Sequence, residues 1–529
     1  MFKPYRLGAL LGAVILTSGC AVNATRALAD RHSSVALAPQ DGVLTHAFVA
    51  PADSGGRSGY HMISVGLDGL AARLELIGTA QHCLDVQYYI FRNDESGSLI
   101  AQALLKAADR GVRIRILMDD GEDVDGDERL FSLAAHPQVE MRVYNPFDYR
   151  GHVRLFRALD FTLHKSRLDH RMHDKLLVAD SAVAVIGGRN LGDQYFQIDS
   201  ASQFGDDDVV VAGPMVAKLS QVFDEFWNNP FSTPAQAFEP KALIAGPALE
   251  AYRHELANRH RQDIFESELV KRLASGEPLA SLTSGKTPLS WAEAKLVYDS
   301  PDKMSVYAGD SQGSLIYEPI DERTASATSD LMMITPYLVP SPKEMQLIKA
   351  ARRRGVSVRI LTNSLVAAPA VTPHAGYTHY RRALLEEGVE MHEIRALVAG
   401  TKGIGQSRRM SKHGNYALHA KLYVFDSKSL FVGSMNFDQR SRRLNTEIGL
   451  IIESPELARE AARRFNSLTE LQNSYWVSLS TPVRGAPSHL IWKTAQGADI
   501  NELTEEPARD FWQRLRLRVA SLLPIDDEL

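Results

Sequence analysis

The stretch HRMHDKLLVAD, which runs from His170 to Asp180, decides the fold of this chain because the chain contains a second copy of it. The copy reads LHAKLYVFD, from Leu418 to Asp426, and the two histidines stand 246 positions apart (419 − 173 = 246). Both copies continue as an apolar run typical of a strand, then a glycine and an asparagine. Either copy alone is ambiguous between a reactive histidine and a basic loop before a buried strand. The constant offset predicts a duplicated domain with matching sites.

The duplication pairs residues whose types suit acid–base and phosphate chemistry. The lysine of each copy comes two positions after the histidine, so on a strand both side chains point to the same face. Each acid comes seven residues before a Gly-Pro or Ser-Pro pair. The matched pairs are His173 and His419, Lys175 and Lys421, Asn190 and Asn436, and Asp206 and Glu447. Asp180 and Asp426, at the far ends of their strands, are interpreted as structural.

These residue types fit the cleavage of a phosphate diester. One histidine can attack phosphorus while the other protonates the leaving oxygen, giving a covalent phospho-histidine that an alcohol or water then releases. A carboxylate on the other ring nitrogen would fix each imidazole, and the lysines and amides would hold the non-bridging oxygens. We expect no cofactor and no metal. The acidic run from Asp119 to Asp125 is interpreted as a solvated loop.

The flanking sequence alternates between strand and helix patterns in both halves. We expect helices over 67–80, 98–111 and 341–355, and strands over 83–91, 112–120, 330–340 and 356–364. This alternation predicts the α/β class, with two tandem lobes that each hold a mixed, largely parallel sheet flanked by helices. The lobes are expected to pack as a pseudo-two-fold pair with one shared active site.

The chain divides into six parts by composition and pattern. The C-terminal part contains PARDFWQRLRLRVASLLP (507–524), with apolar residues at helical spacing and arginines between them. We expect this helix to pack on the body, and the alternative is a helix on a membrane surface. The parts are a signal peptide (1–20), a tether (21–60), the first lobe (61–239), a helical connection (240–300), the second lobe (301–475) and a C-terminal extension (476–529).

The first twenty residues are typical of a bacterial lipoprotein signal. Lys3 and Arg6 precede a short apolar run that ends in LTSGC, with Cys20 as the residue to be lipidated. We expect a lipid anchor on a bacterial membrane facing the periplasm, and Ala21 favours the outer membrane. Cys83 then has no partner, which excludes an intramolecular disulfide and a zinc site of several cysteines.

The overall charge bears on the class of partner. The 529 residues carry a net charge of −5, and the isoelectric point is near 6.4. A dedicated nucleic-acid binder usually carries a basic face that raises this value, so no nucleic-acid partner is expected. Locally, basic residues before the two motifs fit an anionic substrate, and the alternative is that they lie in exposed loops. They are Lys165, Arg167 and Arg171 in the first half, and Arg408, Arg409, Lys412 and His413 in the second.

The repeated His-x-Lys-x4-Asp string, each followed by glycine and Asn, resembles the phospholipase D superfamily. The segments LDVQYYIF, GGRNLGDQYF, FGDDDVVVAGP and NTEIGLII and the ending LPIDDEL resemble its bacterial cardiolipin synthase C-type branch. The resemblance implies transfer of a phosphatidyl group to phosphatidylglycerol, giving cardiolipin, with His173 as nucleophile and His419 as general acid. Asp174 stands where that branch commonly has Asn; on a strand it should face away from the phosphate.

Two alternatives to a phosphatidyltransferase stay open at this point. The same site could act as a hydrolase, either a phospholipase D or a phosphodiesterase on nucleic acid. A lipoprotein that binds anionic lipid without catalysis is the non-enzymatic alternative. The expected partners are anionic and zwitterionic phospholipids, and the donor is either phosphatidylglycerol or phosphatidylethanolamine.

Overall fold

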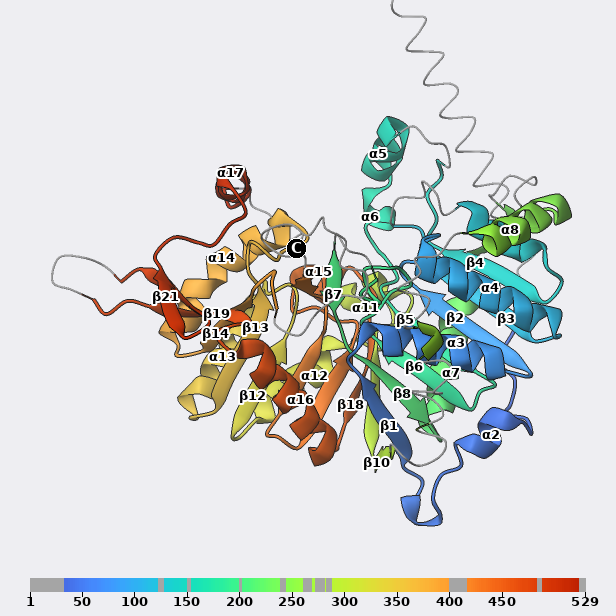
Figure 1. Cartoon of the computed structure of the whole chain (residues 1–529), viewed down its shortest axis with the longest axis horizontal. Helices are drawn as coiled ribbons and strands as arrows, with labels where there is room; N and C mark the ends of the chain where they lie inside the picture. Colours follow the sequence, from blue (N-terminus) through green and yellow to red (C-terminus); the bar gives the residue numbers. More distant parts are fainter. Residues whose placement is uncertain are drawn as a thin grey trace, which may run out of the picture.

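The structure is a computed structural model that describes residues 33–121, 128–149, 154–198, 202–237, 244–259, 269–271, 281, 288–398, 416–482 and 488–522. Within them the chain forms two α/β lobes side by side, the first on the right of Figure 1 and the second on the left. Several residues named above lie outside the described ranges: Lys3, Arg6, Cys20, Ala21, Glu122, Asp123, Asp125, Arg408, Arg409, Lys412 and His413.

The first lobe is built on a nine-stranded sheet in the order β10-β1-β8-β6-β5-β2-β3-β4-β9. Only β2, β3 and β4 run parallel to one another; the other neighbours pair antiparallel. The strands are β1 (Ser58–Ile63), β2 (Cys83–Tyr88), β3 (Arg113–Asp119), β4 (Val139–Tyr144), β5 (Lys175–Ala179), β6 (Val183–Gly187), β8 (Asp208–Ala212), β9 (Ser232–Pro234) and β10 (Ser290–Ala292).

The second lobe repeats this plan in a ten-stranded sheet, β11-β18-β17-β16-β12-β13-β14-β19-β20-β21. Its parallel part is again three adjacent strands, β12 to β14. The strands are β11 (Ala294–Tyr298), β12 (Asp330–Ile334), β13 (Ser357–Asn363), β14 (Glu390–Ile394), β16 (Leu422–Phe425), β17 (Ser429–Gly433), β18 (Ile448–Ile452), β19 (Ser474–Leu479), β20 (Leu490–Gln496) and β21 (Asp499–Leu503).

The tandem α/β lobes are confirmed, but parallel pairing is less extensive than expected. The strand after each histidine, β5 or β16, turns back within a few residues into β6 or β17. So short a connection joins only antiparallel strands, because a parallel crossover needs a dozen residues or more. Asp180 and Asp426 lie in these turns with φ of 51° and 55°.

Helices cover the sheets and begin and end at sequence signals. Asp94 accepts a hydrogen bond from Gly97 N at one start, and Ser341 with Glu344 forms a capping box at another. Gly111 and Gly355 follow two helix ends with positive φ. The principal helices are α3 (Gly66–Thr79), α4 (Glu95–Asp109), α5 (Arg154–Leu163), α6 (Lys165–Leu168), α7 (Met215–Trp227), α8 (Gly246–Asn258), α11 (Lys303–Ala308), α12 (Tyr317–Ser326), α13 (Pro342–Arg353), α14 (Val371–Glu386), α15 (Gln439–Arg443), α16 (Pro455–Thr469) and α17 (Phe511–Ala520).

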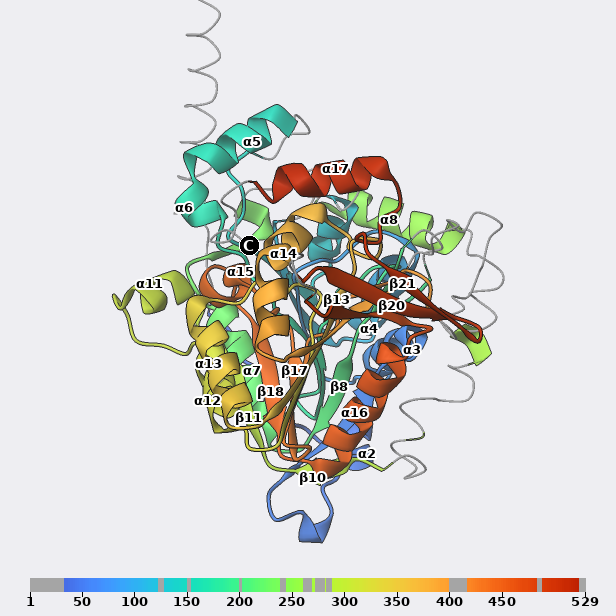
Figure 2. The same cartoon turned by 90° about the vertical axis from the view of Figure 1, so that its left-hand side faces the viewer.

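The two sheets share one apolar core where the lobes meet. Successive residues of β5 point to opposite faces: Leu177 packs with α3 and α4, whereas Leu176 and Val178 join a cluster with α7. That second cluster also contains Val432 of β17 and Ile448 of β18, so it crosses from one lobe to the other. Figure 2 shows α7 and α16 beside the strands of this shared region.

The connection over 240–300 is only partly helical. It contains α8, but its end forms β10 and β11, three and five residues long. β10 pairs with β1 at the edge of the first sheet, and β11 pairs with β18 at the edge of the second. The connection therefore ends by adding one strand to each sheet. Among the described helices, none combines the length and apolar character needed to cross a membrane.

Candidate active site

The two histidines occupy equivalent places at the carboxyl ends of the parallel strands. His173 comes directly before β5, whose Lys175 pairs with Tyr88 at the end of β2. His419 comes before β16, whose Leu422 pairs with Ile334 at the end of β12. Ligands of α/β sheets bind at this edge. The fold thus puts both copies of the motif where a site is expected.

Backbone hydrogen bonds between the lobes fix the segments that carry the histidines. His173 N donates to Thr446 O at 2.9 Å, and Thr446 N donates to Arg171 O at 2.9 Å. In the other half-site, His419 N donates to Gly205 O at 2.8 Å. Two short strands, β7 (Gln203–Gly205) and β15 (Tyr416–Leu418), pair in parallel beside it. Each histidine is therefore held next to the residue that precedes the matched acid of the opposite lobe.

The histidine and carboxylate pairs are crossed between the lobes. His173 Nδ1 lies 2.8 Å from Glu447 Oε2, and His419 Nδ1 lies 2.6 Å from Asp206 Oδ2. A carboxylate on Nδ1 leaves Nε2 of each ring for the substrate. All four residues are buried. The sequence predicted that each acid holds a histidine, but it did not predict which acid holds which.

Burial and the two lysines set the protonation of the imidazoles. Burial first, and then the charges of Lys175 and Lys421, hold the pKa of His173 well below its usual range. Burial and Lys421 lower the pKa of His419 to about 3. Both imidazoles are therefore neutral in the free site near pH 7, and a neutral imidazole is the nucleophilic form.

The two acids differ in charge state. Burial would raise the pKa of Asp206, but His419 and Lys421 outweigh it and the pKa falls below its ordinary value. Burial raises the pKa of Glu447 to about 7, although Lys175 opposes this rise. Asp206 thus stays ionised beside His419 and can stabilise an imidazolium there, whereas Glu447 is only partly ionised near pH 7.

Glu447 is also held by two hydroxyl groups. Ser434 Oγ donates to Glu447 Oε2 at 2.5 Å, and Ser441 Oγ donates to Oε1 at 2.7 Å. In the first lobe the residue matching Ser434 is Gly188, where an added Cβ would come within 2.1 Å of Asp206 Oδ1. The two half-sites therefore have the same arrangement, but a serine hydroxyl bonds Glu447 where a glycine leaves room for Asp206.

Lysine and asparagine side chains complete a donor set for an anionic oxygen. Lys175 Nζ donates to His173 O at 2.6 Å, and Lys421 Nζ donates to His419 O. Burial lowers the pKa of Lys175 to about 7 and that of Lys421 to about 8. Asn190 Oδ1 accepts from Ile90 N at 3.2 Å, while its Nδ2 is buried without a hydrogen-bond partner in the described structure. An amide donor so placed suits a phosphoryl oxygen.

Asp180 and Asp426 bind backbone N–H groups rather than the histidines. Asp180 accepts from Gln81 N, His82 N and Cys83 N at 2.8–3.0 Å. Asp426 accepts from Thr328 N and Ser329 N, at the matching place in the second lobe. These contacts join the turn after β5 or β16 to the start of β2 or β12, which agrees with a structural interpretation.

Asp174, which lies between His173 and Lys175 in the sequence, is fully buried. Its Oδ2 accepts from Gln87 Nε2 on β2 at 2.9 Å. Burial, followed by the charges of Glu447 and Asp299, raises its pKa well above the ordinary value. It is therefore a neutral acid in the interior.

The expectation of a solvated acidic loop after β3 is wrong for the residues that the structure describes. Asp119 and Asp120 are buried. Asp119 Oδ2 accepts from Met172 N at 2.8 Å, and its Oδ1 lies 3.2 Å from Arg171 Nη1. Asp119 can be buried at the end of its strand because Met172 and Arg171, which precede His173, offer it N–H donors. These donors lie 53 and 52 residues away in sequence, so the pattern around Asp119 does not reveal them. Arg171 therefore belongs to the support of this segment rather than to an exposed basic loop.

Several side chains that support the site were not identified from the sequence. Tyr89 packs edge-on against His173 with ring centroids 5.0 Å apart, and Phe204 stacks on His419 at 5.4 Å. Lys303 donates to Asp299 Oδ2 and to Ser441 O, while Asp299 Oδ2 accepts from Glu447 N at 3.0 Å. No chemical pattern marks these residues, and only the position of Tyr89 in LDVQYYIF and of Phe204 in FGDDDVVVAGP could have suggested these two.

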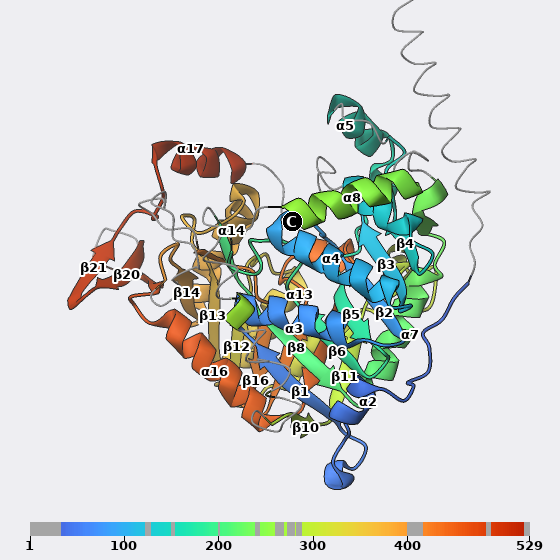
Figure 3. The same ribbon diagram turned by 45° about the vertical axis from the view of Figure 1, so that its right-hand side comes forward.

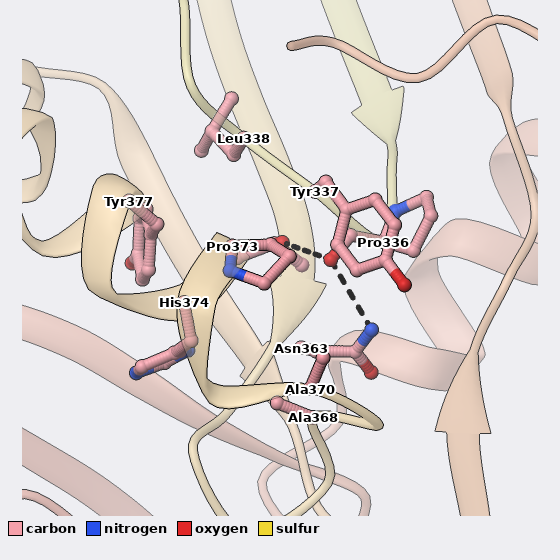
Figure 4. A pocket seen from close by; sticks show the side chains of 10 residues that line it. Pro336, Tyr337, Leu338, Asn363, Ala368, Ala370, Pro373, His374 and Tyr377 are labelled. Carbon is pink, nitrogen blue, oxygen red and sulfur yellow. Dashed lines mark hydrogen bonds between the residues drawn. The ribbon is translucent and has the colours of Figure 1, made fainter. Parts of the chain in front are cut away.

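A pocket at the carboxyl ends of β12 and β13 lies beside the second half-site (Figure 4). Asn363 lines it and bonds the backbone of Leu418, the neighbour of His419, in both directions, at 2.8 and 3.0 Å. Asn363 therefore positions the segment that carries His419. Its other lining residues are Pro336, Tyr337, Leu338, Thr362, Ala368, Ala370, Pro373, His374 and Tyr377.

One group of possible metal ligands occurs among the described residues, away from the paired histidines. Asp148, Asp160 and His164 place their ligand atoms within 4.8 Å of one another. Asp160 Oδ2 already accepts from Asp148 N and Tyr149 N at 2.8 Å, and its Oδ1 lies 2.8 Å from His164 Nδ1. These contacts account for the cluster as a cap on the loop before α5.

Comparisons with known proteins agree with this arrangement. The family described as "Cardiolipin synthase, PLD-like domain" matches residues 74–227 and 320–469. Cardiolipin synthase C of Escherichia coli (strain K12) is 35% identical over 476 residues, covering 89% of this chain and 96% of that protein. A cardiolipin synthase of Geobacillus thermodenitrificans is 24% identical over 406 residues, covering 75% and 65%. The crystal structure of phosphatidylserine synthase from Haemophilus influenzae Rd KW20 has the same fold, with a TM-score of 0.55, 14% identity and coverage of 89% and 95%.

Proposed function

Because this chain belongs to the cardiolipin synthase, phospholipase D-like family and is a phosphatidyltransferase of that superfamily, we propose that it makes cardiolipin through a phospho-histidine intermediate. The observation that supports the chemistry is the pair of crossed histidine–carboxylate contacts, flanked by two buried lysines. Phosphatidylglycerol is the proposed acceptor, because joining its glycerol hydroxyl to a phosphatidyl group gives cardiolipin.

In the first step, Nε2 of His173 attacks phosphorus of the donor phospholipid. The bond from phosphorus to the headgroup oxygen breaks, and His419 Nε2 gives that oxygen a proton. Phosphatidylglycerol as donor would release glycerol, and phosphatidylethanolamine would release ethanolamine. In the second step, a hydroxyl of phosphatidylglycerol loses its proton to His419 and attacks phosphorus. The bond to His173 breaks, and cardiolipin leaves.

The assignment of roles to the two histidines rests on their carboxylates. The general acid must carry a proton on Nε2, and the ionised Asp206 beside His419 stabilises that charged ring. In the free site burial first, and then Lys421 and Lys175, lower the pKa of this ring, and the negative charge of a bound diester opposes the two lysines. Glu447, whose pKa is about 7, supports a neutral His173, which is the form that attacks.

Hydrolysis by the same site is the second candidate, since water can also attack the intermediate. Aromatic side chains stand against both imidazoles, with Tyr89 beside His173 and Tyr195 beside His419. These side chains place apolar surface beside the imidazoles, and a lipid alcohol can bury its own apolar part against such a surface whereas water cannot. Transfer is therefore the proposal and phosphatidic acid is the product that would contradict it.

The experiment is mass spectrometry of lipids after incubation of the protein with phosphatidylglycerol, with and without phosphatidylethanolamine. We expect cardiolipin from the wild type and none from His173→Ala. His254→Ala, a histidine exposed on α8, is the matched control and should behave as the wild type. Phosphatidic acid in place of cardiolipin would identify a hydrolase, and no lipid turnover would contradict the proposal.

The proposed location is a bacterial membrane facing the periplasm, with Cys20 lipidated and the outer membrane favoured by Ala21. The sequence LTSGC supports this proposal. Fractionation of cells should find the wild type with membranes, and Cys20→Ser should abolish incorporation of a labelled fatty acid. Labelling of the Cys20→Ser variant would contradict lipidation at this residue.

A further inference from the structure

Helix α17 shows its apolar side chains to the outside. Gln513 and Leu517 face the body, where Gln513 Nε2 donates to Leu365 O at 2.7 Å and Leu517 packs with Leu365 and Ala375 of α14. The opposite stripe is exposed: Phe511 and Trp512 at 66%, Val519 at 56% and Leu522, just past the helix, at 84%. The helix is therefore packed on the body, as expected, but it keeps an outer apolar face.

Helix α5 of the first lobe has the same character. Leu155, Leu159 and Leu163 recur every fourth residue, and their exposed fractions are 73%, 39% and 62%. Its inner side is held by Phe156 on Tyr149 and Phe161 on Phe147. A row of exposed leucines on an otherwise anchored helix marks an interaction surface.

The two helices come from different lobes but lie on one side of the molecule. α5 and α17 stand at the top of Figure 1, and both stay there when the molecule is turned in Figures 2 and 3. α5 follows β4 of the first sheet, and α17 follows β21 of the second.

Contacts place this side next to the histidines. α5 and α6 lead through His170 directly to His173. α17 binds the loop after β13 through Leu365, two residues beyond the Asn363 that holds Leu418 and hence His419. Both helices thus stand at the carboxyl ends of the parallel strands, where the active site lies.

Positive charge accompanies the exposed apolar side chains. Arg516 and Arg518 are exposed on α17, and Lys165 is exposed at the start of α6. Arg514 lies 3.0 Å from Glu505, so that pair is locally balanced. Aromatic and leucine side chains flanked by arginines are the composition of helices that lie in the interface of an anionic bilayer.

We infer that α5 and α17 together form a docking surface for a bilayer that contains anionic phospholipid, one helix on each side of the active site. This inference rests on the proposed function, since a phosphatidyltransferase must meet its substrate at a membrane surface. The surface would seat the apolar stripes among the acyl chains and the arginines among the phosphates. It would present the paired histidines to headgroups, independently of any anchor at the start of the chain.

The test uses Trp512 as a depth reporter in the full-length protein. Vesicles of phosphatidylethanolamine and phosphatidylglycerol with brominated acyl chains quench a tryptophan that enters the bilayer, and Trp512→Phe identifies its share of the signal. We expect quenching of Trp512 in these vesicles and much less in vesicles of brominated phosphatidylcholine alone.

Variants then connect docking to turnover. Leu515→Asp with Val519→Asp, and separately Leu159→Asp, should lower the rate on vesicle phosphatidylglycerol by about tenfold or more. The rate on short-chain phosphatidylglycerol in detergent should stay within about twofold. Val43→Asp is the matched control, because Val43 is 54% exposed on the short helix α2 (Val43–Ala47), in the lower part of all three views.

The outcomes separate the docking surface from the function. Unquenched Trp512 in an enzyme that turns over vesicle lipid would overturn the docking surface, as would variants that match Val43→Asp. If the surface formed by α5 and α17 binds a protein instead of a bilayer, Trp512 will also stay unquenched in vesicles, and the docking surface is again overturned. Quenched Trp512 in a protein that turns over no phospholipid in vesicles or detergent would leave docking standing and remove the proposed function.

Discussion

At the scale of single residues, the two half-sites share histidine, lysine and asparagine but differ in the acid, which is Asp206 in one and Glu447 in the other, and the two acids differ in charge. Asp206 is ionised beside His419, while Glu447 sits near its own titration midpoint beside His173. The difference follows from the surroundings. Burial raises the pKa of Glu447 more than Lys175 and the two hydroxyl groups lower it, whereas at Asp206 the contacts with His419 and Lys421 outweigh burial. Neutralising the two acids should therefore have unequal effects.

Asp206→Asn should reduce kcat by about 10³–10⁴-fold, since an amide can hold His419 in the wrong tautomer and cannot stabilise an imidazolium. Glu447→Gln should reduce it less, by about 10–10²-fold, because its carboxyl is already partly protonated near pH 7. Steady-state rates on phosphatidylglycerol measure both. Equal losses, or a larger loss for Glu447→Gln, would contradict the assignment of His419 as the acid.

Asp174→Asn should stabilise the protein. The buried carboxyl stays protonated in the folded state, whereas the unfolded chain ionises it above about pH 4, so unfolding releases a proton and stability falls as the pH rises. Each unit of pKa difference corresponds to about 1.4 kcal/mol. Thermal unfolding at pH 8 should therefore favour the variant, with a smaller difference near pH 4 and kcat unchanged within about twofold.

Asp85→Asn is the control for this effect. Asp85 is also buried on β2, but it pairs with Arg115 through two contacts of 2.7 and 2.8 Å. The substitution removes one of the two carboxylates that contact the buried guanidinium of Arg115, leaving Asp224 at 2.8 Å, and should lower the melting temperature. An Asp174→Asn variant that melts lower than the wild type at pH 8 would show that the acid is ionised in the fold.

At the scale of elements, the tight turn after each histidine strand connects the site to the sheet. Asp180 has a φ of 51° and accepts three backbone N–H groups from the segment that enters β2. The same device recurs at Asp426. The invariant place of these acids in both copies thus has a structural cause.

Asp180→Ala should lower the free energy of unfolding by about 2–4 kcal/mol, because it removes the acceptor of three N–H groups, of which that of Cys83 is buried, and puts alanine at a positive φ. Activity per folded molecule should not change. Asp180→Asn should be milder, since asparagine tolerates this backbone conformation and keeps one acceptor. Denaturant unfolding gives the stabilities; a fall in kcat for a fully folded Asp180→Ala would assign the residue to the site instead.

Elements with strong periodic patterns could be predicted from the sequence, as the helices before and the strands after Gly111 and Gly355 illustrate. The paired residues could be predicted too, because the 246-residue offset aligns them without any structure. The crossed assignment of acids to histidines could not, since it depends on how the lobes pack. β10 and β11 were missed because strands of three and five residues at sheet edges carry no distinct periodicity.

At the scale of the whole molecule, the lobes are joined by a shared core as well as by the site. Ile186 and Val209 of the first sheet lie in one cluster with Val432 and Ile448 of the second. Strands β10 and β11 add a covalent tie at adjacent edges. Neither lobe can unfold without exposing apolar surface of the other.

Heating should therefore unfold the protein in one transition, even though chains with two lobes commonly show more than one. Calorimetry should give a ratio of calorimetric to van't Hoff enthalpy near one. Activity should be lost at the same temperature. Two separated transitions, with one lobe melting first, would show that the shared cluster contributes too little to couple them.

The crossed histidine–carboxylate contacts also determine whether the specific activity depends on the concentration of the protein. A site whose histidines each need a carboxylate from the opposite lobe would, in two separate chains, form only as fast and as fully as the chains associate. Here both lobes lie in one polypeptide, so assembly is intramolecular and the effective concentration of one half-site at the other does not depend on how much protein is present. Specific activity should accordingly be the same for a single molecule on a sparse membrane as for a crowded one.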